Sequence, residues 1–300
     1  MPFGLFEKGA EITLTIDRPQ GPYYPGEVIH ATLGLQVDKA VKVREVRVVL
    51  LLQSKYKTLV QQEEEDPTTH AKTTKTVEQQ NSDEKEIDKQ TPLHEGTINA
   101  GQTLTIDLHI PPDAVPVYLS PNIETHWVVK ATVDRSMASD SNAEIQLPLI
   151  VPPPGTYNNQ GEFGTSTNLD VAAMRISLPR LEYAAGETLN GELILEPAQD
   201  FEGREVRIEL LQRERVTGGS QPNEAETSDQ KMQLAGTTKY QRGNAVRYNF
   251  SLAVAPKGRP TFSSPTATAQ WILKATVDRP WASDAESTQE IYVYSAARAT

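Results

Sequence analysis

The sequence predicts an all-β protein built from two tandem antiparallel β-sandwich domains. Apolar and polar residues alternate with a period of two along many short segments, as strands with one buried face require. No window of a dozen residues carries a helical apolar stripe free of proline and glycine. KATVDRSMASD at 130–140 returns as KATVDRPWASD at 274–284, with nine of eleven positions identical. Alternation and repetition together indicate two copies of one β domain.

The repeat extends well beyond this phrase. Three further pairs of segments match: REVRVVLL (44–51) with REVRIELL (204–211), YYPGEVIHATLGL (23–35) with YAAGETLNGELIL (183–195), and LHIPPDAVP (108–116) with LAVAPKGRP (252–260). The first two pairs are offset by 160 residues and the third by 144, a fall of 16. The offset falls because the segment after Val60 is longer than its counterpart at 217–230.

A repeat of about 150 residues is long enough for each copy to own a hydrophobic core. PPPGTYNNQGEFGTSTNLD (152–170) lies between the copies and has the Pro, Gly and Asn content of a linker. We therefore predict a first domain at 1–155, a linker at 156–168 and a second domain at 169–300.

The strands expected within each domain follow from the alternation. Clear runs occur at 12–16, 29–35 and 127–133, and turn signals such as Pro25-Gly26 punctuate them. About seven or eight strands in each copy predict an immunoglobulin-like sandwich.

One segment departs from this alternation. QQEEEDPTTHAKTTKTVEQQNSDEKEIDKQ (61–90) is strongly polar and nearly free of large apolar side chains, so it lacks the means to form a core. We expect an acidic loop over residues 60–92 of the first domain, in the form of a mobile solvated segment. A charged loop that binds a partner is the alternative.

Composition argues against several classes of function. The net charge of −11 opposes nucleic-acid binding, because duplex binders carry a basic face. The absence of cysteine excludes disulfides and thiolate metal sites, and it favours a reducing, cytoplasmic location. No stretch approaches the roughly 18 apolar residues of a membrane span. The N-terminus lacks the features of an export signal, so membrane insertion is not expected.

In this order, the repeated phrases resemble the arrestin family. YYPGE leading into ATLGLQV is similar to the family's opening, and IPPDAVPVYLSPNIETHWVVKATVDR (110–135) resembles its strand of the form W-x-V-K-A-x-V-D-R. KATVDRPWASD is especially similar to arrestin-domain-containing proteins of the alpha-arrestin type. The resemblance covers nearly the whole chain. It implies two sandwiches in an arrestin-like arrangement that binds other proteins and performs no catalysis.

Several features of larger arrestins have no counterpart here. Alpha-arrestins recruit ubiquitin ligases through PPxY motifs, whereas the string from Pro153 to Tyr157 has one residue too many. The sequence ends soon after EIYVYS, so we expect no regulatory tail, and Lys8 stands alone where phosphate-sensing relatives carry adjacent lysines. What remains resembles the minimal prokaryotic arrestin-like proteins, including the sporulation-control family.

No catalytic or metal motif accompanies this architecture. The sequence has five histidines, all in the first copy and none in an HxxxH or HExxH spacing: His30, His70, His94, His109 and His126. GxSxG, GxxxxGK[ST] and GxGxxG are absent, and a Ser-His-Asp arrangement would show only in three dimensions. We predict no enzyme activity, catalytic residue, cofactor or metal ion.

The repeated Asp-Arg pair supplies four candidate contact residues: Asp134, Arg135, Asp278 and Arg279. On a structural interpretation, Asp-Arg ends a strand, with the Asp accepting in the turn or pairing with the Arg. Calcium is an alternative, but it requires six to eight oxygens and the carboxylates are too sparse here. A domain-interface or partner contact is the remaining alternative, because a guanidinium offers five donors in a fixed fork.

The three tryptophans are of two kinds. Trp127 and Trp271 occupy equivalent positions in apolar runs, which predicts core packing rather than a ligand-stacking platform. Trp281 follows Pro280 in a turn where the first copy has Met137. An exposed aromatic in such a turn is a candidate partner contact.

Together these features predict a non-enzymatic, cytoplasmic arrestin-like adaptor or scaffold that binds protein partners in signalling or trafficking. Strand edges and grooves between domains would provide the binding surfaces. Neither nucleic acid nor membrane insertion is expected, and peripheral association through a membrane-protein partner is left open. An extracytoplasmic β-sandwich pair that binds carbohydrate or calcium is the alternative, disfavoured by the missing export signal and the sparse loop acids.

Overall fold

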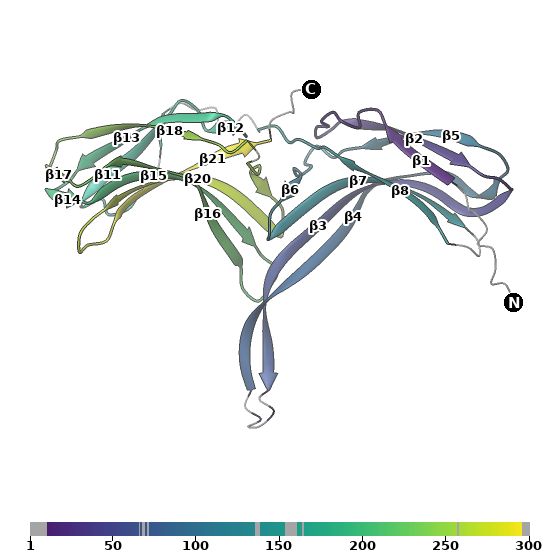
Figure 1. Ribbon diagram of the computed structural model, residues 1–300, viewed down its shortest axis with the longest axis horizontal. Helices are drawn as coiled ribbons and strands as arrows, with labels where there is room; N and C mark the ends of the chain where they lie inside the picture. Colours follow the sequence, from purple (N-terminus) through teal and green to yellow (C-terminus); the bar gives the residue numbers. More distant parts are fainter. Residues whose placement is uncertain are drawn as a thin grey trace.

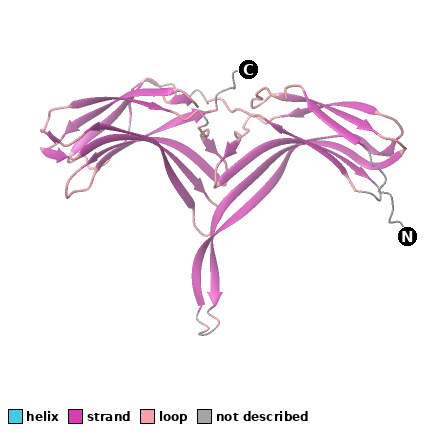
Figure 2. Ribbon diagram, in the orientation of Figure 1, coloured by secondary structure: helices cyan, strands magenta, loops and turns pink. Residues whose placement is uncertain are grey.

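The computed structural model describes residues 11–65, 67, 70, 72–135, 139–153, 161–163, 165–256 and 258–295. Within these ranges every regular element is a β-strand (Figure 2). The strands form two sandwiches that extend to opposite sides of a shared junction (Figure 1). The predicted all-β fold with antiparallel sheets is confirmed. Among the described residues there is no helix long and apolar enough to cross a bilayer.

The first sandwich packs two antiparallel sheets face to face. The smaller sheet has the strand order β1 (Glu11–Ile16), β2 (Val28–Gln36), β5 (Gln102–His109). The larger sheet has the order β4 (Lys72–Ile98), β3 (Val41–Glu65), β7 (Ile123–Arg135), β6 (Tyr118–Leu119), and β8 (Ser141–Leu147) also pairs with β7. Their inner faces enclose one apolar cluster, which defines the first core.

The second sandwich contains three sheets. The first has the order β18 (Val246–Ala253), β13 (Thr188–Pro197), β11 (Ala172–Leu178), β9 (Gly161–Phe163). The second has the order β10 (Thr165–Ser166), β21 (Ala285–Tyr294), β20 (Ala267–Asp278), β15 (Glu205–Val216), β16 (Asn223–Ala235), with β12 (Glu182–Ala184) on β21 and β19 (Phe262–Ser263) on β20. A ribbon of β14 (Phe201–Gly203) and β17 (Thr238–Tyr240) completes it. β9 and β10 thus bring part of the segment at 156–168, expected as a linker, into the sheets of this sandwich.

Both sandwiches follow one pairing scheme. The order β1-β2-β5 corresponds to β11-β13-β18, and the order β4-β3-β7-β8 corresponds to β16-β15-β20-β21. The residue offsets of the repeat hold in the strand register, since Leu52 lies opposite Trp127 in the first copy and Gln212 opposite Trp271 in the second. The repeat in the sequence is therefore also a repeat of strand order and pairing.

The core faces are those that the alternation predicts. In β2, Ile29, Ala31 and Leu33 are fully buried while His30 points outward. Trp127 and Trp271 are each 1% exposed, which confirms their predicted core packing. Each indole N–H donates to a backbone carbonyl, of Val115 at 2.9 Å and of Arg259 at 2.7 Å, so neither polar atom is left unpaired.

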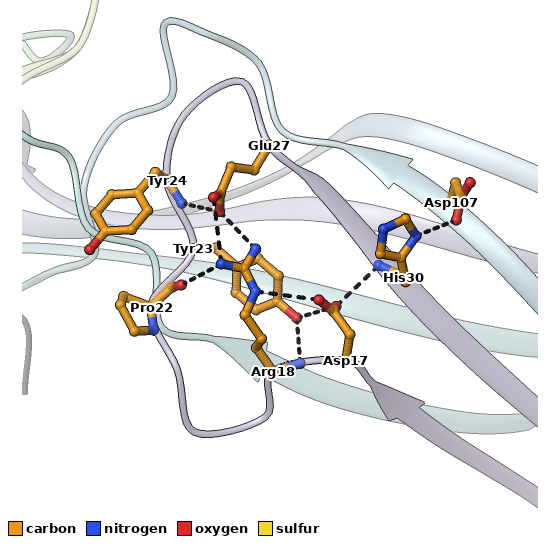
Figure 3. A network of polar contacts seen from close by, with 8 residues as sticks. All are labelled: Asp17, Arg18, Pro22, Tyr23, Tyr24, Glu27, His30 and Asp107. Carbon is orange, nitrogen blue, oxygen red and sulfur yellow. Dashed lines mark hydrogen bonds and ion pairs between the residues drawn. The ribbon is translucent and has the colours of Figure 1, made fainter. Parts of the chain in front are cut away.

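An arginine clamp fixes the turn that leads into the second strand of the first sandwich (Figure 3). The Arg18 guanidinium lies 4.2 Å from the centre of the Tyr23 ring and its Nη2 donates to Glu27 Oε2 at 2.8 Å. Glu27 also accepts the backbone N–H of Tyr24 at 2.9 Å, and the hydrogen bond from Arg18 lowers the pKa of this carboxyl. Gly26 supplies the positive φ of 84° that the turn requires.

The second sandwich contains the same clamp, made by Arg180, Tyr183 and Glu187. The guanidinium lies 4.8 Å from the ring centre and donates to the carboxylate at 2.9 Å. Arg18 precedes a proline whereas Arg180 follows one, so the two arginines reach equivalent places from different sequence positions. Because both copies hold the clamp, we assign it to the stability of the turn and not to a ligand.

The expected acidic loop at 60–92 is wrong: these residues lie in a long β-hairpin that projects from the junction (Figure 1). β3 and β4 remain paired as far as Glu65 opposite Lys72. Lys75 forms an ion pair with Glu64 across the ribbon. Polarity misled the expectation, because a ladder that starts in a buried sheet can continue outward through backbone hydrogen bonds while both faces stay in water.

We predict that Trp271→Ala lowers the free energy of unfolding by about 3 to 5 kcal/mol, because it empties a buried site that the strands cannot close. Trp281→Ala is the matched control, and its effect should stay within about 0.5 kcal/mol because that side chain is exposed. Urea unfolding followed by circular dichroism measures both. Equal losses in the two variants would contradict the assignment of Trp271 to the core.

Candidate functional site

The two sandwiches meet through equivalent positions of the repeat. Tyr118 of β6 packs against Phe262 of β19, with ring centres 5.4 Å apart. Ile123 and Ala267, again equivalent, belong to the same buried cluster. The contact therefore has the character of a two-fold dimer interface formed within one chain. We call this contact, with its surrounding hydrogen bonds, the seam.

A buried carboxylate joins the two sides of the seam. Glu214 is 4% exposed and accepts hydrogen bonds from the Tyr118 hydroxyl at 2.7 Å, the Asn122 amide at 3.1 Å and the Arg259 guanidinium at 3.2 Å. The Gln212 amide donates to the Tyr118 hydroxyl at 3.1 Å. A buried charge is stable only when it is paired and hydrogen-bonded. Burial, together with the charge of Glu214, raises the pKa of Tyr118 well above its ordinary value.

The projecting hairpin also contacts the second sandwich. The carbonyl oxygen of Leu59 accepts from the backbone N–H of Ser220 at 2.8 Å and from its hydroxyl at 3.0 Å. The Asn223 side chain donates to the carbonyl of Lys57 at 2.9 Å. A Cβ atom at Gly219 would lie 2.2 Å from the Leu59 carbonyl oxygen, so the crossing requires glycine there.

A groove of about 720 Å³ lies beside the seam. Alternate residues of β3, namely Leu52, Ser54, Tyr56 and Thr58, line its hairpin side. The loop at 111–115 of the first sandwich and residues 263–266 of the second also line it. We call this the interdomain groove. Because both sandwiches and the hairpin contribute to it, it is the candidate binding site.

Residues that line or flank the groove differ between the two copies of the repeat. The buried carboxylate of the second copy and two residues beside it have smaller or apolar counterparts in the first: Glu214 matches Ser54, Gln212 matches Leu52, and Arg259 matches Val115. Across the seam, Phe262 lacks the hydroxyl that its counterpart Tyr118 offers to Glu214. The second copy thus has a hydrogen-bonded polar cluster at these positions, whereas the first copy has the open interdomain groove.

The predicted contact residues of the first copy lie at the other end of their sandwich. Asp134 accepts from Arg44 at 2.8 Å, and Arg135 donates to the carbonyl of Ser139 at 2.7 Å. β7 has 13 residues, so Arg135 lies about 40 Å from the seam end of that strand. The sequence left open whether the aspartate accepts in the turn or pairs with the adjacent arginine. In the structure Asp134 pairs instead with Arg44 of β3, and Asp140 accepts in the turn.

The second copy repeats this arrangement. Asp278 accepts from Arg204 at 3.0 Å, and Arg279 donates to the carbonyl of Ser283 at 2.8 Å. In the described part of the chain, the hydrogen bonds of all four predicted residues stay within their own sandwich. The structure therefore does not bring them to the domain interface, and a partner contact stays a prediction.

Trp281 is fully exposed, with 104% of its reference surface in solvent. Its φ of 59° is unusual for a bulky residue. Arg204 and Arg279 line the same shallow surface depression. Met137, the counterpart of Trp281 in the first copy, lies outside the described residues. The exposure agrees with the sequence interpretation, while a partner contact at Trp281 stays a prediction.

Histidines of the first sandwich form separate pairs with carboxylates. His30 Nδ1 lies 2.8 Å from Asp107, whose hydrogen bond raises the pKa of the imidazole, and His109 Nδ1 lies 3.2 Å from Asp88. Among the described residues, no three His, Cys, Asp or Glu side chains gather in a way that would hold a metal ion.

The sequence predicted binding grooves between the domains, but it did not identify the residues that form the seam and the groove. The sequence did contain a signal for these residues. Gln212 and Glu214 place polar side chains on a strand face where the first copy has Leu52 and Ser54. Polar residues that replace apolar or small ones at equivalent positions of a repeat mark places where the two copies have different neighbours.

Comparison with known families agrees with this architecture. Residues 8–155 match the family described as arrestin (or S-antigen), C-terminal domain. An arrestin-like β-sandwich therefore makes up the first half of the chain, and the second half repeats its strand order. The predicted arrestin-like resemblance is confirmed. No curated protein matches the chain.

We predict that Tyr118→Phe lowers the free energy of unfolding by about 1 to 3 kcal/mol at pH 7, because Glu214 loses a donor in a buried site. Phe262 shows that a phenylalanine ring fits the equivalent position. The difference should shrink above pH 10, since the raised pKa of Tyr118 stabilises the folded wild type only while the unfolded tyrosine stays protonated. Urea titrations at pH 7 and pH 11 measure this. A difference that grows with pH would contradict it.

Proposed function

We propose that the protein is a non-enzymatic adaptor that binds a protein partner in the interdomain groove. The groove itself carries this proposal, because its lining comes from both sandwiches and from the hairpin. A site shared by two domains suits recognition, since its shape depends on how they meet. The arrestin-like domain supports the proposal, because proteins of that family serve as protein-binding adaptors.

We further propose that the chain works as two domains, 1–155 and 169–300, connected through 156–168. Two separate apolar clusters, one in each sandwich, support this division. A scaffold role in signalling or trafficking within the cytoplasm fits a chain of 300 residues that has no cysteine. The seam would then hold the two domains in the relative position that shapes the groove.

Val115→Arg tests the proposal, because it places in the first copy the side chain that occupies the equivalent depression of the second. We expect the variant to fold and to recover about tenfold less partner after crosslinking in native lysate, with mass spectrometry as the readout. Leu169→Arg adds the same charge at a site that is 63% exposed, so it serves as the matched control. Equal recovery by both variants and the wild type would remove the groove as the binding site.

A further inference from the structure

We propose that the interdomain groove takes an arginine side chain of the partner protein; this inference rests on the function proposed above. In the second copy, an arginine of the chain itself, Arg259, occupies the equivalent position. Arg259 Nη1 donates to Glu214 Oε1 at 3.2 Å and to Gln212 Oε1 at 3.3 Å. The seam thus shows how a guanidinium is held on this face of the repeat.

The first copy lacks that arginine but keeps the space for it. Val115 stands at the position of Arg259 and ends two carbons beyond Cα, so the volume of a long side chain is absent. Leu52, Val115 and Trp127 line the groove. Their apolar atoms suit the methylene stem of an arginine, which packs on apolar surface while its charged end reaches polar groups.

The first copy also keeps a carboxylate, displaced by one strand. Ser54, the counterpart of Glu214, is uncharged, but Asp83 of β4 lies directly opposite it in the ladder. In the second copy the residue opposite Glu214 is Ala225. Directly opposed side chains have Cβ atoms about 5 Å apart. The second copy therefore has its carboxylate on β15, whereas the first copy has one on β4, the strand equivalent to β16.

A second carboxylate, that of Asp113, lines the groove from the loop after β5. Within the described chain, neither Asp83 nor Asp113 has a hydrogen-bond or ion-pair partner for its carboxylate. Lys85 is the basic residue among those that line the groove, so the lining carries two acids and one base. This balance, with a net charge of −11 for the chain, favours a cationic side chain over an anionic one.

Arginine fits better than lysine for two physical reasons. A guanidinium is planar and weakly hydrated, so it stacks on aromatic rings such as that of Tyr56 in the groove. It also presents several donors at once, which suits two carboxylates and the hydroxyl of Ser54. A lysine ammonium is a strongly hydrated point charge and would lose more solvation on entering this partly apolar space.

The experiment uses the full chain with isotope-labelled methyl groups and a set of short peptides. The probe is acetyl-TVRVT-amide, and its matched controls replace the arginine by citrulline, lysine or glutamate. We expect the arginine peptide to shift the methyl resonances of Leu52 and Val115. The citrulline peptide, which has the same shape without the charge, should bind at least about tenfold more weakly, and the glutamate peptide should not bind.

Substitutions in the groove test which of its residues bind the arginine peptide. Asp83→Asn should weaken the arginine peptide about threefold, as expected for a partly exposed ion pair, whereas Asp38→Asn removes a carboxylate elsewhere and should have no effect. Val115→Arg should abolish binding. Equal binding of the arginine and citrulline peptides, or unchanged binding to Val115→Arg, would overturn the inference.

Failure of this inference can be told apart from failure of the proposed function. If the arginine peptide does not bind but Val115→Arg still loses the partner from lysate, the groove binds the partner through another side chain and the arginine assignment alone is overturned. If Val115→Arg and Leu169→Arg recover the partner equally, the groove is not the adaptor site and both proposals are overturned.

Discussion

The burial of the Glu214 carboxylate at the seam is the interaction on which the arrangement of the two sandwiches depends. One sandwich supplies the carboxylate and Arg259, and the other supplies the donors of Tyr118 and Asn122. Separating the sandwiches would leave Glu214 without two of its three donors, which is costly for a buried charge. The hydrogen bonds therefore specify a relative position that apolar contact between Tyr118 and Phe262 alone would define less sharply.

The same interaction explains why two copies of one domain are not equivalent. A symmetric pair would carry either two carboxylates or two apolar depressions at the seam. Here the second copy has a polar cluster that hydrogen-bonds to Tyr118, and the first copy has the open interdomain groove. The longer β3–β4 hairpin adds to this asymmetry, because its crossing with residues 219–223 extends the contact on one side only. The departure from the repeat, rather than the repeat, marks the candidate site.

Much of each sandwich could be predicted from local patterns. Alternation located β2 and its buried face, and the repeat placed Trp127 and Trp271 at equivalent core positions. Polarity was a poor guide to the hairpin, because backbone pairing does not require apolar side chains. The partner of Asp134 was missed for a different reason: Arg44 is 90 residues away, and no local signal distinguishes it from the adjacent arginine.

Local patterns along the chain were enough to predict many strands of the two sandwiches, their buried faces and the repetition, because these depend on periods of two and on matching segments. The places where the copies touch and where they leave space depend instead on contacts between distant segments. Tyr118 and Glu214 are 96 residues apart, and the groove is lined by residues of both sandwiches and of the hairpin. Such a site depends on which side chains meet across the seam, and that is a property of packing in three dimensions rather than of any one segment.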